Sequence, residues 1–347
     1  MQNQLEVRDV SVKYGRQTVV DRVSFELESA VIGCLLGPSG CGKTSLLRAI
    51  AGFEPLALGE ILLHGENVSR PGQTLAPEKR RVGMVFQDFA LYPHLSVGAN
   101  VAFGLRGMSG RQQRQRVAEL LGLVGLSGLE EKYPHQLSGG QQQRIALIRA
   151  MAPRPEILLL DEPFSGLDVE LREQLAGEVR TILKREGVTA ILVTHDQLEA
   201  FALADQIGVL GSGRLRQWDS GFNIYHEPAD RFVADFIGQG TMIPGRVLAD
   251  GRIESSLGIL SADFNQQHQA GDSVELLLRP DDLVHDDESD FKLEITDKVF
   301  QGAEYLYTLS LDDGTELLCL VQSHHDHGIG ERIGIRLAVD HVVAFPS

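Results

Sequence analysis

The chain has 347 residues, of which 43% are hydrophobic and 23% charged, a composition typical of a globular protein of about two domains. Its formal net charge of −16 argues against a nucleic-acid partner, because such partners usually select a basic surface. No run approaches the roughly 18 apolar residues that a membrane span needs. The N-terminus also lacks the basic and then apolar pattern of a signal peptide, so we expect a cytoplasmic protein.

The first structural elements can be read from the order of apolar and polar residues. Residues 1–28 alternate between the two, which predicts an antiparallel layer. An apolar run from Ala30 to Leu36 predicts a buried strand, and a helix that stops at Gly52 follows it. A hairpin is expected near residues 59–64.

The loop between this strand and this helix has the composition of a phosphate cradle. It consists of Gly37, Pro38, Ser39, Gly40, Cys41, Gly42, Lys43 and Thr44, with Ser45 following in the same predicted nucleotide site. The glycines let several backbone N–H groups point inward, and the helix N-terminus adds a positive dipole end. Lys43 can reach the β- and γ-phosphates, and the Thr44 hydroxyl can hold Mg²⁺. The pattern predicts nucleotide binding, although kinases and GTPases share it.

Helical patterns dominate from residue 88 to about residue 155. The apolar run Val82–Phe86 predicts a strand that ends at Gln87, and the apolar loop Phe89–His94 beyond it suggests a partner surface. Further along, Ser138 and Gln141 form a capping box ahead of a helix expected over Arg144–Met151. Glycine costs about 1 kcal/mol against alanine in a helix, so the two glycines in between suggest that another group approaches closely.

Two carboxylates end the next buried strand, which is predicted over Glu156–Leu160. Parallel sheets bind ligands at the carboxyl ends of their strands, so Asp161 and Glu162 are expected beside the cradle. Asp161 is then placed to hold Mg²⁺, and Glu162 to polarise an attacking water. The alternative is a solvated acidic strand end. His195 similarly ends a strand predicted over Ala190–Thr194.

The cradle, the string Leu137–Gln141 and the strand Ile157–Glu162, in this order, resemble the ATP-binding cassette (ABC) family of transport ATPases. The resemblance implies an α/β P-loop NTPase fold with a RecA-like core, an antiparallel β subdomain and a helical subdomain over about 88–155. It also implies ATP and Mg²⁺ as ligands, and a head-to-tail homodimer that holds two ATP molecules between its subunits.

The same resemblance assigns roles to individual residues. Glu162, Gln87 and His195 would be catalytic, with Gln87 contacting Mg²⁺ and the water and His195 bonding the γ-phosphate. Thr44, Gln87 and Asp161 would form the Mg²⁺ site. Ser138, Gly139, Gly140 and Gln141 would bind the γ-phosphate of ATP held by the second copy. Asp168 would bridge the subunits, and Tyr14 would stack on adenine; the alternative for Tyr14 is a plain surface position on a strand.

Beyond Phe236–Gly240 the chain changes to short alternating runs with hairpin signals, which predicts a small all-β domain. Leu278–Asp282 resembles a segment of the OB-like regulatory domain of importer ATPases. We therefore expect an ABC nucleotide-binding domain over 1–237 and an OB-like regulatory domain over 238–347. The clusters Asp286–Glu288 and His324–His327 fall in expected loops and are open to two interpretations, solvated loops or metal ligands.

The resulting hypothesis is the ATP-hydrolysing subunit of a bacterial ABC importer on the cytoplasmic face of the cell membrane. Its partners would be permease subunits and, indirectly, a periplasmic solute-binding protein. The residues around 236–258 most resemble ferric-ion importers, with sugar, polyamine, thiamine or phosphonate import left open. A non-transport ABC ATPase is the remote alternative. Chromosome-maintenance ATPases carry a long coiled coil between cradle and signature, and this chain has no heptad array there. Ribosome-acting ATPases carry two cassettes, and this chain has one. A nucleotide kinase would leave the Ser138 turn unexplained.

Overall fold

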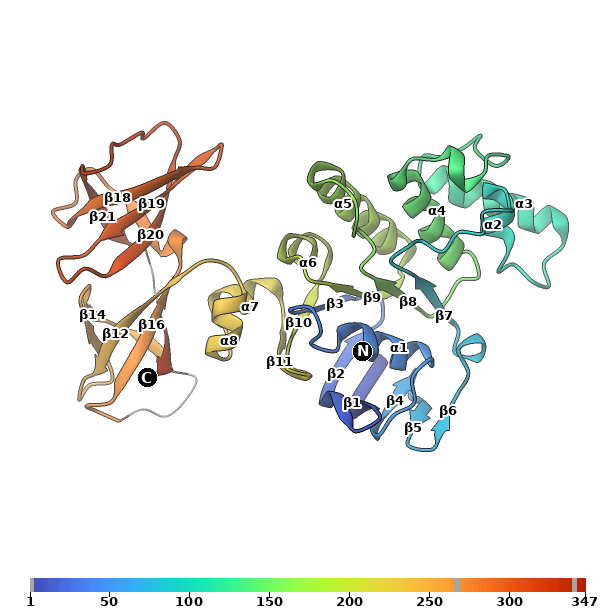
Figure 1. Ribbon diagram of the computed structural model, residues 1–347, viewed down its shortest axis with the longest axis horizontal. Helices are drawn as coiled ribbons and strands as arrows, with labels where there is room; N and C mark the ends of the chain where they lie inside the picture. Colours follow the sequence, from blue (N-terminus) through green and yellow to red (C-terminus); the bar gives the residue numbers. More distant parts are fainter. Residues whose placement is uncertain (1–2, 265–268, 339–341) are drawn as a thin grey trace. The chain divides into compact units, whose positions relative to one another are not determined.

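A computed structural model describes residues 3–264, 269–338 and 342–347 of the chain (Figure 1). The chain divides into two compact units, residues 1–221 and 222–347. This division falls earlier than the boundary that the sequence predicts, so helix α8 (Arg231–Phe236) belongs to the second unit.

A mainly parallel sheet forms the centre of the first unit. Within the described residues its strands lie in the order β11 (Arg214–Asp219), β10 (Gln206–Gly211), β3 (Ile32–Leu36), β9 (Thr189–Thr194), β8 (Ile157–Asp161) and β7 (Val82–Val85). Only β11 runs antiparallel to its neighbour. Strands β3 and β9 are buried at every position, which explains their continuous apolar sequence.

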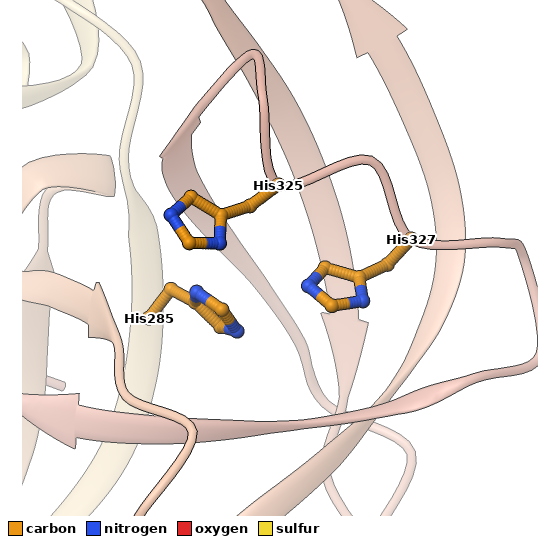
Figure 2. Close-up of side chains that lie close together, drawn as sticks. All are labelled: His285, His325 and His327. Atoms are coloured by element: carbon orange, nitrogen blue, oxygen red, sulfur yellow. The ribbon is translucent and has the colours of Figure 1, made fainter.

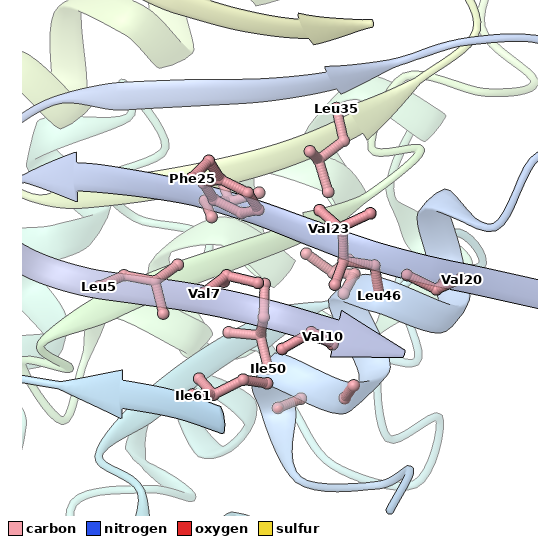
Figure 3. Close-up of a cluster of buried hydrophobic side chains, with 14 of the residues drawn as sticks. Leu5, Val7, Val10, Val20, Val23, Phe25, Leu35, Leu46, Ile50 and Ile61 are labelled. Carbon is pink, nitrogen blue, oxygen red and sulfur yellow. The ribbon is translucent and has the colours of Figure 1, made fainter. Parts of the chain in front are cut away.

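An antiparallel sheet forms a second layer, as the alternation of the first 28 residues predicts. Its strands lie in the order β2 (Gln17–Glu28), β1 (Asn3–Tyr14), β4 (Leu58–Leu63), β5 (Glu66–Arg70) and β6 (Gln73–Thr74). Figure 3 shows side chains of β1, β2 and β4 gathered with Leu46 and Ile50 of helix α1 (Lys43–Ala51) and with Leu35 of β3. The helix that follows the phosphate cradle is therefore fixed by the core of this unit.

Residues 88–155 contain three α-helices, in agreement with the predicted helical subdomain, and none of the strands in the described structure lies there. They are α2 (Val97–Ala102), α3 (Gly110–Leu123) and α4 (Gly139–Met151), which Figure 1 shows gathered at the β7 end of the central sheet. Two further helices, α5 (Val169–Glu186) and α6 (Gln197–Leu203), follow β8 and β9.

The second unit is built on two β-sheets and two short helices, in agreement with the predicted all-β domain. One sheet has the order β14 (Gly258–Leu260), β13 (Ile253–Ser255), β12 (Thr241–Val247), β16 (Ser273–Leu278), β22 (Val342–Pro346) and β15 (Ala262–Phe264). The other has the order β17 (Leu283–His285), β21 (Arg332–Leu337), β18 (Lys292–Phe300), β19 (Glu304–Ser310) and β20 (Glu316–Gln322). Residues of both sheets share one hydrophobic core.

Arg279 joins the short helices of this unit to its sheets. Its buried guanidinium donates hydrogen bonds to the carbonyls of Tyr225, in α7 (Gly221–His226), and of Ala234, in α8. It also lies over the Tyr225 ring, whose hydroxyl donates to Asp281. This cluster explains why the Arg-Pro-Asp segment is present and why α8 belongs to the second unit.

Candidate active site

The strand order of the central sheet brings four loops to one edge. The cradle follows β3, His195 follows β9, the two carboxylates end β8, and Gln87 follows β7. These strands are neighbours and run parallel, so their carboxyl ends lie side by side.

Lys43 is folded into the cradle. Its buried Nζ lies 2.7 Å from the Gly37 carbonyl oxygen and 3.0 Å from that of Pro38. A side chain at Gly37 would meet the Leu210 carbonyl oxygen at 2.3 Å, and Gly42, at φ +103°, would place one 2.5 Å from the Val19 carbonyl oxygen. Only glycine fits at these two positions, because the loop passes close to the backbones of β10 and β2.

Thr44 and Asp161 meet beside the cradle. The Thr44 hydroxyl donates to Asp161 Oδ1 at 3.1 Å, across two strands of the sheet. Partial burial raises the pKa of Asp161, and this hydrogen bond opposes the rise. Two hard oxygen donors, the type that Mg²⁺ prefers, are thus adjacent at the N-terminus of α1.

Glu162 lies between Gln87 and His195. Gln87 Nε2 is 3.5 Å from one carboxylate oxygen of Glu162, and His195 Nδ1 is 3.5 Å from the other. The backbone of Glu162 is left-handed, at φ +44°, and its N–H donates to the Val193 carbonyl. The structure therefore brings the three predicted catalytic residues together.

An open cleft of about 690 Å³ adjoins this edge of the sheet, although Lys43, Glu162 and His195 are not part of its lining. Its lining includes Thr44, Gln87 and Asp161, and also Arg48 and Gly166. Arg48 was not predicted. It lies one turn after Thr44 on α1, and only the structure shows that this position of the helix lines the cleft. The charge of Arg48 acts on Asp161 and lowers its pKa, against the larger effect of burial.

Tyr14 lies beside the same helix. Its hydroxyl is 3.4 Å from Ser45 Oγ, and 45% of the residue is exposed. An exposed aromatic ring next to the cradle can stack on a planar base.

The Ser138 turn is the N-terminus of α4, and it is not part of the lining of this cleft. Ser138 and Gln141 form the predicted capping box, but the helix begins at Gly139, five residues earlier than expected. A side chain at Gly140 would lie 3.4 Å from Leu171 and Leu175 of α5. At that distance an added methyl group makes ordinary van der Waals contact, and one at Gly139 would lie 3.3 Å from Leu167, so packing within the chain does not by itself require glycine at Gly140.

Asp168 caps α5 by accepting from the Leu171 N–H at 3.0 Å. Four residues later, Arg172 pairs with Asp196 at 2.9 Å and donates to the Leu167 carbonyl. Arg172 thus ties the loop that holds Asp168 to the loop that holds His195. This pairing could not be predicted from the sequence, because the two partners are 24 residues apart and on different elements.

The buried Asn100 and the partly buried Arg149 hold the loop after Gln87. The Asn100 amide donates to the carbonyls of Tyr92, Leu95 and Ser96, and Arg149 donates to those of Phe89 and Ala90. Tyr92 and Arg149 also line a groove of about 770 Å³ beside Phe53 and Phe103, each about half exposed. The apolar loop predicted as a partner surface is therefore part of a hollow with a defined shape.

Comparison with known proteins places these observations in a family. The model of the ABC transporter family matches residues 20–165, and that of the TOBE domain matches residues 261–345. The chain is 41% identical to the spermidine/putrescine import ATP-binding protein PotA of Pseudomonas fluorescens (strain Pf0-1), over 349 residues that cover 96% of this chain and 95% of PotA.

The match with the ABC transporter family agrees with a site in which the phosphate cradle lies beside Asp161 and Glu162. No helix among the described residues is long and apolar enough to cross a membrane. The fold is that of a P-loop NTPase followed by an OB-like, barrel-shaped TOBE domain. The chain belongs to the ATP-binding subunits of ABC importers, the ATPases that couple ATP hydrolysis to import.

Proposed function

We propose that this chain hydrolyses ATP to power the import of a polyamine such as spermidine or putrescine. The relationship with PotA, over nearly the whole of both chains, carries this proposal. It favours the polyamine alternative over the ferric-ion importer that the residues around 236–258 resemble. The residues of the hydrolytic site do not indicate which substrate is transported, because other subunits of an importer bind the substrate.

The residues at the cradle fit Mg²⁺ and ATP. Backbone N–H groups from Gly40 to Thr44 and the Lys43 ammonium would bind the phosphates, and Tyr14 would stack on the adenine. Thr44, Asp161 and Gln87 would hold Mg²⁺, since the first two already lie 3.1 Å apart. When bound, Mg²⁺ neutralises charge on the phosphate oxygens.

Glu162 is the proposed general base. Its carboxylate would accept a proton from the water that attacks the γ-phosphate. Gln87 and His195 lie 3.5 Å away, one at each carboxylate oxygen, and would orient the water and bond the phosphate. The contact of Arg172 with Asp196 would keep the His195 loop in place.

The site would be completed by a second copy of the chain. The Ser138 turn is an exposed helix N-terminus that can bind the γ-phosphate of the opposite ATP. A symmetric dimer would then hold two equal sites. In each copy the loop Phe89–His94 and the groove beside Phe53 would receive a permease subunit at the cytoplasmic face of the membrane. A periplasmic solute-binding protein would act only through that permease.

Uptake by the source cell tests the cargo. Deleting the gene for this chain should abolish uptake of labelled spermidine or putrescine and leave ferric-ion uptake unchanged. The wild-type gene should restore uptake, and the Glu162→Gln variant should not. Loss of ferric-ion uptake with normal polyamine uptake would replace the polyamine proposal by the ferric-ion one.

A further inference from the structure

Three histidines meet in the second unit, far from every nucleotide residue in the sequence. His285 ends strand β17, and His325 and His327 lie in the loop that follows β20. One ring nitrogen from each can be chosen so that all three lie within 4.8 Å of one another. Figure 2 shows the three rings facing a common space.

The loop that carries two of these histidines is held by buried and charged groups. The hydroxyl of the fully buried Tyr307 donates to the His325 carbonyl and accepts from the His327 N–H, at 2.9 and 3.0 Å. Lys298 donates to the His327 carbonyl at 2.9 Å and pairs with Asp326. The backbone is therefore fixed on both sides of His327, which positions its ring.

Two ring nitrogens in this cluster are buried and lack a hydrogen-bond partner in the described part of the chain. They are Nε2 of His285 and Nε2 of His327. The His285 side chain is only 8% exposed, so water has little access to it. Because a buried polar atom without a partner costs about 1–3 kcal/mol, a ligand that satisfies these two nitrogens would be favoured here.

The environment of these nitrogens also fits a cation. Asp287 Oδ1 lies 3.2 Å from His285 Nε2, in a geometry that makes no hydrogen bond. In His327 the two ring nitrogens have different surroundings. Nε2 has no partner and could bind a metal, whereas Nδ1 lies 3.5 Å from the Glu331 carboxylate oxygen Oε2. A carboxylate behind a ligating histidine is the usual support of such a ligand.

We propose that His285, His325 and His327 bind one divalent transition-metal ion, with Zn²⁺ as the ion that fits best. Three imidazoles with an open fourth position are a known zinc ligand set. Zinc–nitrogen bonds of about 2.0–2.1 Å place tetrahedral ligands ~3.4 Å apart, so ring nitrogens that lie within 4.8 Å of one another need to converge by at most about 1.4 Å. Water or the exposed Asp287 carboxylate takes the fourth position.

This site differs from the cluster that the sequence offered. His324 does not belong to the three-histidine cluster, since its Nε2 forms a hydrogen bond with Oε1 of the exposed Gln322 at 2.9 Å. His285, some 40 residues earlier, takes its place because β17 pairs with β21, next to the loop. The bound ion would join β17 to the connection between β20 and β21, and would make the stability of this unit depend on zinc.

Metal binding to the full chain tests the proposal. Tag-free protein, stripped with EDTA and kept in excess Mg²⁺ without nucleotide, should bind one Zn²⁺ in calorimetry. Loss of a residue that only supports a metal ligand weakens metal binding by at most ~100-fold. Because we propose that these histidines are ligands, we expect a greater loss of Zn²⁺ affinity from each of His285→Ala, His325→Ala and His327→Ala. His324→Ala, in the same loop, is the matched control and should bind as the wild type does.

Cobalt provides a readout that does not rely on the variants. Co²⁺ bound to the wild-type chain should give the intense visible absorption of a tetrahedral site, and Zn²⁺ should displace it. Unchanged ATP binding will show that each variant is folded. Zinc binding that survives all three substitutions, or no tetrahedral cobalt spectrum in the wild type, overturns the proposal.

Discussion

At the scale of single residues, the backbone of Glu162 explains where its carboxylate lies. A left-handed φ of +44° is uncommon for a residue other than glycine, and a hydrogen bond to Val193 holds it there. The turn directs the side chain toward Gln87 and His195. Strain of this kind persists where function requires it, and Glu162 is the proposed base.

Lys43→Ala tests the cradle. The ammonium forms charge-assisted hydrogen bonds, each of about 1.5–3 kcal/mol, so losing its phosphate contacts should weaken ATP binding by roughly 10- to 100-fold. Calorimetry with Mg²⁺ and ATP measures this. Lys292→Ala removes an equal charge from an exposed strand of the second unit and should leave the affinity unchanged. Near-normal affinity in Lys43→Ala would show that another group binds the phosphates.

Residues in contiguous motifs were predictable because strand, turn and helix fix their geometry over a few positions. The cradle, Asp161 and Glu162 belong to this class. Arg172, Asn100 and Arg149 were not predicted, because each acts through partners that only the folded chain brings near. His285 is a similar case, since strand pairing and not spacing places it beside His327.

At the scale of elements, Arg80 holds the helix that follows the cradle. Its guanidinium is buried and donates to the Ala49 and Ile50 carbonyls at the end of α1, and to Val68, Ser69 and Leu75 in the neighbouring layer. Burial lowers the pKa of Arg80 to about 10, so it is still charged at neutral pH. Gly52 ends the helix in a left-handed conformation at φ +92°, and a side chain there would also meet Arg80 Nε at 2.4 Å.

Arg80→Leu should lower the free energy of unfolding of the first unit by at least about 3 kcal/mol, since several buried carbonyls lose their donor. Trp218 is the single tryptophan of the chain and stacks on Phe25 in this unit, so its fluorescence during urea unfolding reports the change. The neighbouring Arg81 is exposed and pairs with Glu156; Arg81→Leu should cost less than about 1 kcal/mol. Equal effects of the two substitutions would refute the role given to Arg80.

Apolar periodicity predicted where the elements lie in the chain, but it did not predict the residues at which they begin and end. The capping box at Ser138 was visible, yet α4 begins at Gly139, because the box satisfies N–H groups of a first turn that contains both glycines despite their low helix propensity. The strand predicted from Ala30 begins at Ile32, since Ala30 adopts a left-handed turn conformation at φ +61°.

At the scale of the whole molecule, we propose that the chain consists of an ATPase domain and a regulatory domain that fold separately. Every proposed nucleotide residue lies before residue 222. A fragment of residues 1–221 should therefore fold and bind ATP with the affinity of the full chain, as measured by calorimetry. An unfolded fragment, seen by circular dichroism, would show that the first unit needs the second.

In the proposed mechanism, Glu162 activates the water in a site shared by two copies of the chain. Glu162→Gln keeps the cradle and the Mg²⁺ ligands but removes the base. The most direct measurement is gel filtration of this variant with and without ATP, alongside its steady-state turnover. We predict an ATP-dependent dimer and no measurable hydrolysis, and that Ser138→Arg added to the variant abolishes the dimer. Hydrolysis at the wild-type rate, or a monomer in saturating ATP, would contradict the claim.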